Sequence, residues 1–234
     1  MPAAVITGAA GDLGRALSAA FAGEGYAVFG GDIAPVPAQD GLTGVTLDVT
    51  DRAAVFALAE RAAAAAGPLR LWINAAGIVR VVKVAEADAA DWERIIAVNL
   101  TGTFHGCAAA LAVMCRTGGG RIVNLGSLSG QVGGTALHPA YGASKAGVHA
   151  LTRTYALEGA RHGVYCNAVA PSVLAGAMGS QFSERQRAQL ASANPLRRLG
   201  RIEEVVGAVR YLASAEASYT TGVILPLNGG AYLA

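Results

Sequence analysis

The stretch Thr7-Gly8-Ala9-Ala10-Gly11-Asp12-Leu13-Gly14 decides the fold of this chain. It lies between a short apolar run, Ala3–Thr7, and a segment whose apolar residues follow helical spacing. Glycines in such a strand-to-helix turn let the backbone approach a pyrophosphate, and the start of the helix attracts its negative charge. A tight loop without a ligand would use the same glycines, so the turn alone is a weak signal. It is typical of a dinucleotide-binding unit of strand, turn and helix.

Asp32 supports the same interpretation. It follows the apolar run Tyr26–Gly31 and stands eighteen residues after Gly14. At that place a carboxylate accepts hydrogen bonds from the adenosine ribose, and it repels a 2′-phosphate. No arginine follows Gly31 or Ile33 to receive such a phosphate, so the sequence favours NAD over NADP. A solvated loop acid is the simpler alternative.

Strand-like and helix-like segments alternate along the rest of the chain. The expected strands are Ala3–Thr7, Tyr26–Gly31, Val45–Leu47, Leu69–Ile73, Arg121–Leu125, Val164–Val169 and Val223–Leu225. The longer expected helices lie near residues 51–67, 91–115, 141–161 and 202–213. Alternation without a break in composition predicts an α/β fold, a doubly wound parallel sheet of about seven strands with helices on both faces. We expect one three-layer α/β/α domain over residues 1–234.

The composition restricts the classes of function. Of 234 residues, 53% are hydrophobic and 15% charged, which supplies a sizeable core. The net charge is +2, and the densest basic cluster, Arg197, Arg198 and Arg201, is short, so we expect no nucleic-acid partner. Three unpatterned cysteines in apolar settings indicate a reducing, cytoplasmic location. The N-terminus lacks the features of export or membrane insertion, and we expect no metal site.

Tyr141 and Lys145 form a second informative pair. They lie one helical turn apart, which puts a phenol and an ammonium on one helix face. A free tyrosine titrates near pH ~10, and a neighbouring positive charge lowers the phenol's pKa. The pair is therefore a plausible proton donor, although a surface tyrosine beside a solvated lysine has the same spacing.

With these residues placed, the chain resembles the short-chain dehydrogenase/reductase family, in its compact single-domain branch, almost from end to end. The glycine turn from Thr7 to Gly14 and the pair Tyr141 and Lys145 match the family's motifs. The other matching motifs are Leu47-Asp48-Val49, Asn74-Ala75-Ala76-Gly77, Val98-Asn99-Leu100-Thr101-Gly102, Asn124-Leu125-Gly126-Ser127, Asn167-Ala168-Val169-Ala170-Pro171 and Asn228-Gly229-Gly230. The resemblance implies a Rossmann-type fold and hydride transfer between a nicotinamide and a secondary alcohol or ketone.

The resemblance also implies a role for each catalytic residue. Tyr141 would pass a proton to or from the substrate oxygen, and Ser127 would hydrogen-bond that oxygen. Lys145 would lower the tyrosine pKa and bind the nicotinamide ribose, while Asn99 would anchor a water linking Lys145 to solvent. The implied cofactor-binding residues are Gly8, Gly11, Asp12, Leu13, Gly14, Asp32, Ile33, Asp48, Val49, Asn74, Ala75, Gly77, Tyr141, Lys145, Pro171 and Val173.

The chain departs from the family pattern at a few positions. Asp12 stands where the family usually has glycine, and we expect its side chain to turn away from the pyrophosphate and cap the first helix. Ser172 replaces a glycine, and Gly176 replaces a threonine that often contacts the cofactor. We therefore expect a mobile substrate lid at about 172–193 and modest cofactor affinity. The loop before Tyr141 is one residue longer than usual, and we expect its His138 to be solvated, with substrate contact as the alternative.

Other functions remain open on the sequence. A 3-oxoacyl-thioester (acyl-carrier-protein) reductase is the nearest alternative, but such enzymes usually prefer NADPH, which Asp32 disfavours. A non-catalytic NAD(H)-binding sensor would not need the intact catalytic set. A cofactor-free dehalogenase of related fold would replace Lys145 with arginine. Family members commonly form homotetramers, and the resemblance implies the same here, through helices near 91–115 and 141–161 and the C-terminal tail.

Overall fold

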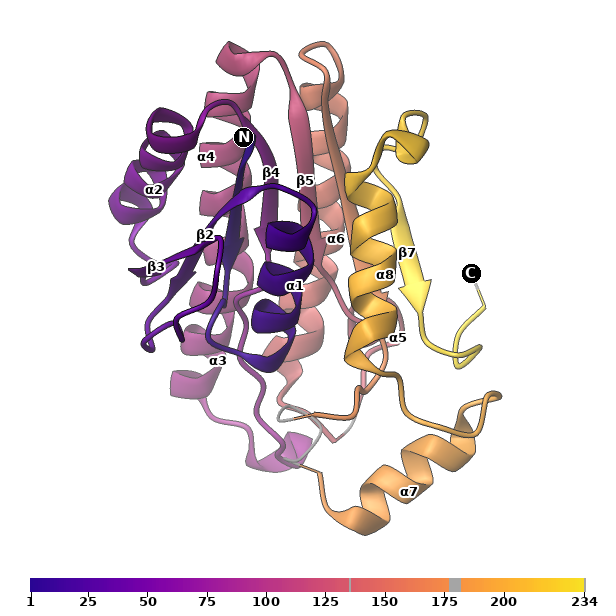
Figure 1. Ribbon diagram of the computed structural model, residues 1–234. Coiled ribbons are helices and arrows are strands. Elements are labelled where there is room, and N and C mark those ends of the chain that lie inside the picture. The colour runs from indigo at the N-terminus through magenta and orange to yellow at the C-terminus, as the bar shows by residue number, and fades with distance from the viewer. Residues whose placement is uncertain (135, 177–181, 234) are drawn as a thin grey trace.

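The computed structural model describes residues 1–134, 136–176 and 182–233. Its centre is a seven-stranded sheet in the order β3-β2-β1-β4-β5-β6-β7, and every pairing is parallel (Figure 1). The strands are β1 Ala3–Thr7, β2 Ala27–Asp32, β3 Leu42–Thr46, β4 Leu69–Asn74, β5 Gly120–Leu125, β6 Val164–Pro171 and β7 Ile224–Leu227. The predicted doubly wound α/β fold is thereby confirmed.

Helices cover both faces of the sheet, and Figure 1 shows α1 and α8 on one face and α2, α4 and α6 on the other. Strand β1 shows why both faces need cover, because its side chains alternate between them. Ala3 and Val5 join the apolar cluster below α2 and α4, whereas Ala4 and Ile6 join the cluster below α1 and α8. The helices are α1 Asp12–Gly23, α2 Arg52–Ala66, α3 Ala89–Ile96, α4 Gly102–Thr117, α5 Ser129–Val132, α6 Pro139–Ala160, α7 Glu184–Ala193 and α8 Ile202–Ala213, with short segments η1 Val84–Glu86, η2 Ala97–Thr101 and η4 Ala215–Ala217.

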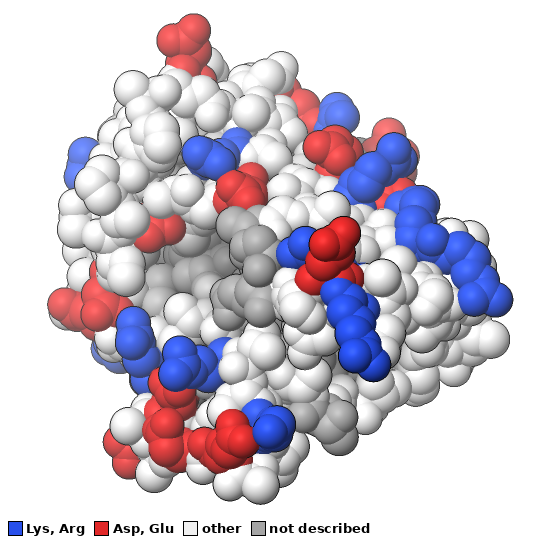
Figure 2. Space-filling model, turned by 90° about the horizontal axis from the view of Figure 1, so that it is seen from below, with Lys and Arg blue, Asp and Glu red and all other residues white. Residues whose placement is uncertain are grey.

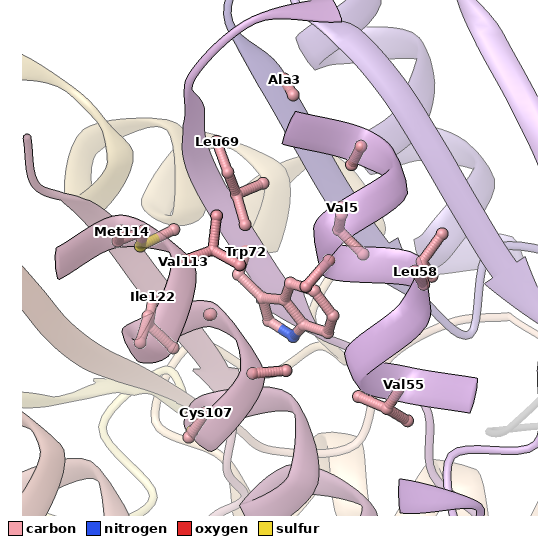
Figure 3. Packing of buried hydrophobic residues seen from close by; sticks show 14 of the residues in the cluster. Ala3, Val5, Val55, Leu58, Leu69, Trp72, Cys107, Val113, Met114 and Ile122 are labelled. Carbon is pink, nitrogen blue, oxygen red and sulfur yellow. The ribbon is translucent and has the colours of Figure 1, made fainter. Parts of the chain in front are cut away.

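Trp72 of β4 is the largest fully buried side chain, packed among aliphatic residues of the strands and of α2 and α4 (Figure 3). Its ring N–H donates to Asn74 Oδ1 at 2.7 Å. Asn74 Nδ2 in turn donates to Asn124 Oδ1 at 2.8 Å, and Asn124 Nδ2 donates to Thr152 Oγ1 at 3.0 Å. The thiols of Cys107 and Cys166 lie beside the same amide, at 3.4 and 3.6 Å from Asn124 side-chain atoms. The core therefore contains a satisfied polar chain that links β4, β5 and α6.

The lid region contains a regular helix that the sequence analysis did not predict. Helix α7 begins after Ser183, whose hydroxyl accepts from the Gln186 N–H at 3.2 Å while Gln186 Oε1 accepts from the Ser183 N–H at 2.8 Å. This reciprocal pair is a capping box. Residues 177–181 of the expected lid lie outside the described residues, and the lid's mobility stays a prediction.

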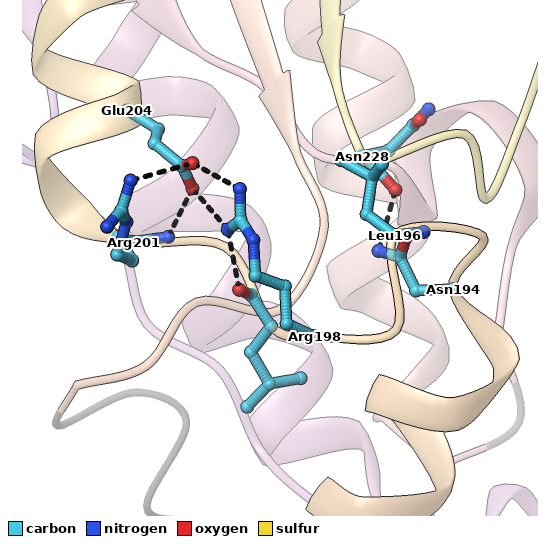
Figure 4. Close-up of polar contacts among 7 residues, drawn as sticks. Asn194, Leu196, Arg198, Arg201, Glu204 and Asn228 are labelled. Atoms are coloured by element: carbon cyan, nitrogen blue, oxygen red, sulfur yellow. Dashed lines mark hydrogen bonds and ion pairs between the residues drawn. The ribbon is translucent and has the colours of Figure 1, made fainter.

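Arg198 and Arg201 of the short basic cluster converge on Glu204 in the first turn of α8 (Figure 4). Arg198 reaches both carboxylate oxygens, at 2.9 and 2.5 Å, and the Arg201 backbone N–H donates to one of them at 2.8 Å. The Arg198 hydrogen bonds and the Arg201 N–H lower the pKa of Glu204 to about 2. These contacts tie the segment that follows α7 to the start of α8.

Strand order reverses between β1 and β4, because the chain moves outward from β1 to β2 and β3 before it returns to β4. Ligands of such sheets bind beyond the carboxyl ends of the strands at this switch point. Figure 2 looks onto the face at this end of the sheet, where acidic and basic side chains both occur among the described residues.

Candidate active site

The glycine turn between β1 and α1 is shaped by close contacts. Gly8 has φ +74°, and a Cβ on it would lie 2.7 Å from the Ala76 backbone nitrogen. A Cβ on Gly14 would lie 2.0 Å from the Gly8 carbonyl oxygen. Gly11 differs, since its Cβ would meet only that oxygen, at 3.5 Å. Two glycines thus allow the turn to pack on the segment after β4 and on α1, while the third leaves room above the turn.

Asp32 ends β2 and is fixed against this turn. Its Oδ2 accepts from the Ala10 N–H at 3.0 Å, and its Oδ1 accepts from the Ala34 N–H at 2.9 Å. Ile33, next to it, is 70% exposed. The carboxylate is thereby held beside the glycine turn, as the sequence pattern predicts for a ribose-binding acid.

Asp48 and Val49 follow β3 at the same edge. Asp48 Oδ1 accepts from the Thr50 N–H at 2.8 Å and from the Thr50 hydroxyl at 2.7 Å, and these two bonds lower the pKa of Asp48. Val49 is buried, and its carbonyl oxygen lies 3.0 Å from His105 Nδ1 of α4. The loop that carries the predicted cofactor-binding residues Asp48 and Val49 is therefore anchored to α4.

Asp12 does not cap the first helix, so that expectation is wrong. The N-cap is Gly11, which has no side-chain cap bond, and Asp12 is the first residue of α1. One of its carboxylate oxygens pairs with Arg15 at 2.7 Å. The other lies 3.5 Å from where a Cβ on Gly176 would be. The position of Asp12 in the helix accounts for this. A capping side chain comes from the residue that precedes the first turn, whereas a side chain inside that turn interacts with residues three or four positions along the helix. Leu13, its neighbour, packs against the cluster below α1.

Asn74 is turned away from the edge, since both polar atoms of its side chain belong to the interior chain with Trp72 and Asn124. Only the backbone of Asn74 is therefore available for a contact with a cofactor. Ala75 is half-buried in the cluster below α1. Gly77 lies between two site residues, because its Cβ would be 3.4 Å from Asn99 Oδ1 and 3.6 Å from Lys145 Nζ.

On the other side of the switch point, β6 ends at Pro171, whose carbonyl accepts from the Leu128 N–H at 2.9 Å. The Val173 carbonyl accepts from the Gly200 N–H at 3.2 Å. These bonds place the predicted cofactor-binding residues Pro171 and Val173 between the Ser127 loop and the segment before α8.

Tyr141 and Lys145 lie on α6, one turn apart and buried, with 8% and 5% of their surfaces exposed. Lys145 Nζ donates to the Leu125 carbonyl at the end of β5 at 2.7 Å and lies 5.9 Å from the centroid of the Tyr141 ring. Ser127 follows the same strand, and its Oγ accepts from the Ser129 N–H at 3.1 Å. The structure therefore brings the three residues together at one strand end.

Asn99 completes the group from a π-helical turn, Ala97–Thr101, between α3 and α4. Its Oδ1 accepts from the Ile78 N–H at 2.8 Å, and its Nδ2 donates to the Ile78 carbonyl at 2.9 Å and to Ser144 Oγ at 3.2 Å. π-turns within helices frequently mark functional sites. Asn99 joins the loop after β4 to the helix that carries Tyr141 and Lys145.

Burial controls the protonation of this pair. It raises the pKa of Tyr141, with a hydrogen bond to the Ser127 side chain acting in the opposite direction. It lowers the pKa of Lys145 to about 8. The expected lowering of the phenol's pKa by Lys145 is not seen here, because burial sets the direction of the shift and the Lys145 ammonium points to the Leu125 carbonyl.

His138 is not solvated, so that expectation is also wrong. It is 2% exposed and is the N-cap of α6, where its Nδ1 accepts from the Ala140 N–H at 3.2 Å. Its Nε2 lies 3.0 Å from the Asp88 carbonyl before α3. The sequence carried a signal for this cap, since Pro139 at the first helical position marks a helix start.

Comparisons with known proteins extend over nearly the whole chain. A family model described as enoyl-(acyl carrier protein) reductase matches residues 8–232. The 3-oxoacyl-[acyl-carrier-protein] reductase of Thermotoga maritima is 36% identical over 236 residues, covering 97% of this chain and 96% of that protein. The cis-4-hydroxycyclohexanecarboxylate dehydrogenase of Sinomonas cyclohexanicum is 39% identical over 237 residues, covering 97% and 95%. The galactitol 2-dehydrogenase (L-tagatose-forming) of Cereibacter sphaeroides is 41% identical over 189 residues, covering 80% and 74%.

A parallel sheet with a glycine turn at its switch point, together with these relatives, defines an oxidoreductase that uses a nicotinamide cofactor. The chain belongs to the short-chain dehydrogenase/reductase family.

Proposed function

We propose that this protein transfers a hydride between NAD(H) and a secondary alcohol or the matching ketone, with Tyr141 as the general acid and base. The observation that carries the proposal is the convergence of buried Tyr141, Lys145 and Ser127 on the end of β5. A phenol that keeps its proton is suited to donate it to a carbonyl oxygen undergoing reduction.

The residues of the site fit a dinucleotide. The open space above Gly11 suits a pyrophosphate at the start of α1. A bound nicotinamide supplies the hydride acceptor for oxidation or the donor for reduction. Ser127 would hydrogen-bond the substrate oxygen, and Tyr141 would exchange a proton with it. Lys145 would bind the nicotinamide ribose, and Asn99 would hold the loop after β4 against α6 beside it.

Asp32 supports NAD as the preferred cofactor. Its two oxygens accept backbone N–H groups on both sides, so the carboxylate cannot swing away from a 2′-phosphate. The neighbouring Ile33 offers no positive charge to such a phosphate. Replacing Asp32 with alanine should therefore narrow the preference for NADH over NADPH, and equal use of both by the unaltered protein would contradict this part of the proposal.

The test is a screen of ketones and secondary alcohols with NAD(H) and NADP(H), followed by the variant Tyr141→Phe. We expect the variant to lose turnover and keep dinucleotide binding, because only the hydroxyl is removed. Tyr165→Phe, a tyrosine on β6 that stacks with Arg121, is the matched control and should retain turnover. NADH binding without turnover on any substrate would favour the sensor alternative.

A second candidate is a 3-oxoacyl-thioester (acyl-carrier-protein) reductase. The similarity to the Thermotoga maritima reductase favours it, because that protein is named for this reaction and matches the chain over nearly its full length. A 3-oxoacyl thioester belongs in the same screen. If it is reduced with a much higher kcat/KM than simple ketones, this candidate replaces the first.

We also propose that the protein is a cytoplasmic homotetramer. The helix from Ala89 to Thr117 is long and apolar enough to span a membrane, but half of its most apolar window is buried against the fold. Phe104 of this helix is 42% exposed. On the neighbouring α6, Leu157 is 81% exposed. A second copy that packs on α4 and α6 would cover them. Sedimentation that gives a monomer would refute the assembly.

A further inference from the structure

We propose that His149 is a positioning residue that holds the backbone of Ser127 from helix α6. The inference rests on the proposed function for the substrate role of Ser127, but the contact itself is a feature of the fold. His149 lies on α6 one turn beyond Lys145 and two turns beyond Tyr141, and it is 4% exposed.

Three successive N–H groups after β5 show what His149 does. The Gly126 N–H donates to the Val169 carbonyl at 2.8 Å, and the Leu128 N–H donates to the Pro171 carbonyl at 2.9 Å, so both continue the pairing with β6. The Ser127 N–H, between them, points to the other side, as alternation along a strand requires. It donates to His149 Nε2 at 3.4 Å.

Lys145 binds the same stretch of backbone one peptide group earlier. Its Nζ donates to the Leu125 carbonyl at 2.7 Å. Side chains four apart on a helix thus hold backbone groups two residues apart on an extended strand end. Lys145 and His149 together therefore fix the position and the orientation of the Ser127 backbone relative to Tyr141, which also lies on α6.

Two glycines leave space for the imidazole ring. A Cβ on Gly126 would lie 2.4 Å from His149 Nε2, and a Cβ on Gly130 would lie 2.8 Å from Cε1. Side chains at these positions would displace the ring from Ser127. The ring is therefore seated between the strand end and α5, with little room for another orientation.

The contact also requires the neutral imidazole, because Nε2 accepts only when the proton is on Nδ1. Burial, with Arg153 and Lys145 adding to its effect, lowers the pKa of His149 to about 4. His149 therefore remains an acceptor at neutral pH.

The test compares two amides at this position. In His149→Gln the side-chain oxygen can still reach the Ser127 N–H, whereas in His149→Asn it is one methylene too short. His162→Asn, at an exposed histidine after α6, is the matched control. For each variant we would measure amide hydrogen exchange of residues 126–129, dinucleotide Kd, melting temperature, and kcat and KM on the best substrate of the screen.

We expect His149→Asn to raise exchange at Ser127 at least tenfold and lower kcat at least tenfold, with dinucleotide Kd within about twofold of the unaltered protein. His149→Gln should recover most of both. Unchanged exchange in His149→Asn would refute the contact, and raised exchange with unchanged kcat would refute its positioning role. If both variants lower kcat, raise the dinucleotide Kd and lower the melting temperature to the same extent, His149 has only a structural role and the proposal is overturned. If the unaltered protein turns over no substrate, the proposed function fails, while exchange still decides on the contact.

Discussion

Replacing Lys145 with methionine is expected to change the pH dependence of stability in a defined way. Burial lowers the pKa of Lys145 from 10.5 to about 8. Since one pKa unit corresponds to about 1.4 kcal/mol, holding the ammonium in the fold is unfavourable by about 3 kcal/mol well below pH 8. Methionine removes this penalty but also the hydrogen bond to the Leu125 carbonyl, which a charged donor makes worth about 1.5–3 kcal/mol. Near pH 7 the variant should therefore be as stable as the unaltered protein or up to about 2 kcal/mol more stable.

The slope with pH separates the two contributions. Because the pKa of Lys145 is lower in the folded state, the unfolded chain binds more protons between pH 8 and 10.5, and stability rises with pH across that window. The methionine variant lacks this rise. The difference in unfolding free energy, variant minus unaltered protein, should fall by about 2 kcal/mol between pH ~7 and ~9.5.

The assay is urea unfolding of the protein without added dinucleotide, at several pH values. Lys83→Met is the matched control, because Lys83 is the chain's other lysine and its side chain is exposed instead of buried. A Lys145→Met difference that stays constant from pH ~7 to ~9.5 would show that burial does not perturb this lysine, and the reasoning would fail.

Three further predictions concern stability. Arg197 has φ +55°, a conformation that costs an L-residue about 1–2 kcal/mol, so Arg197→Gly should raise the melting temperature by about 2–4 °C; a fall would contradict this. His138→Ala should lower the unfolding free energy by about 1 kcal/mol more than His138→Asn, because both variants lose the ring and its contact with the Asp88 carbonyl but only asparagine can still cap α6; urea titrations that rank the two equally would exclude capping. Asn124→Ala leaves Asn74 and Thr152 without their buried partner, so urea unfolding should show a loss of at least about 2 kcal/mol, and a smaller loss would mean that water replaces the amide.

Local pattern was enough to predict the sheet. β1 and α8 coincide with the predicted ranges, because an unbroken apolar run and a helical period leave one interpretation each. The family motifs also placed Ser127, Tyr141 and Lys145 in one site, and the structure brings them together because the first turns of α6 lie against the end of β5. Their assigned roles stay predictions.

Tertiary contacts explain what the sequence did not reveal. Helix α7 is polar and shows little apolar periodicity, so only its capping box could have marked it. Asn74 points inward because Trp72 and Asn124 face it, and neither contact can be seen in a strand pattern. The pKa directions of Tyr141 and Lys145 follow from burial, which depends on the whole fold.

The buried thiols beside Asn124 have a practical consequence. Cys107 and Cys166 have no exposed surface, whereas Cys115 is partly exposed. A thiol reagent should label Cys115 in the folded molecule and reach the other two only when the sheet opens. The rate of the slow labelling phase would then give the rate at which the sheet opens spontaneously in native buffer. Because a ligand that binds only the folded form suppresses opening by mass action, the same phase would report dinucleotide affinity without any substrate or turnover.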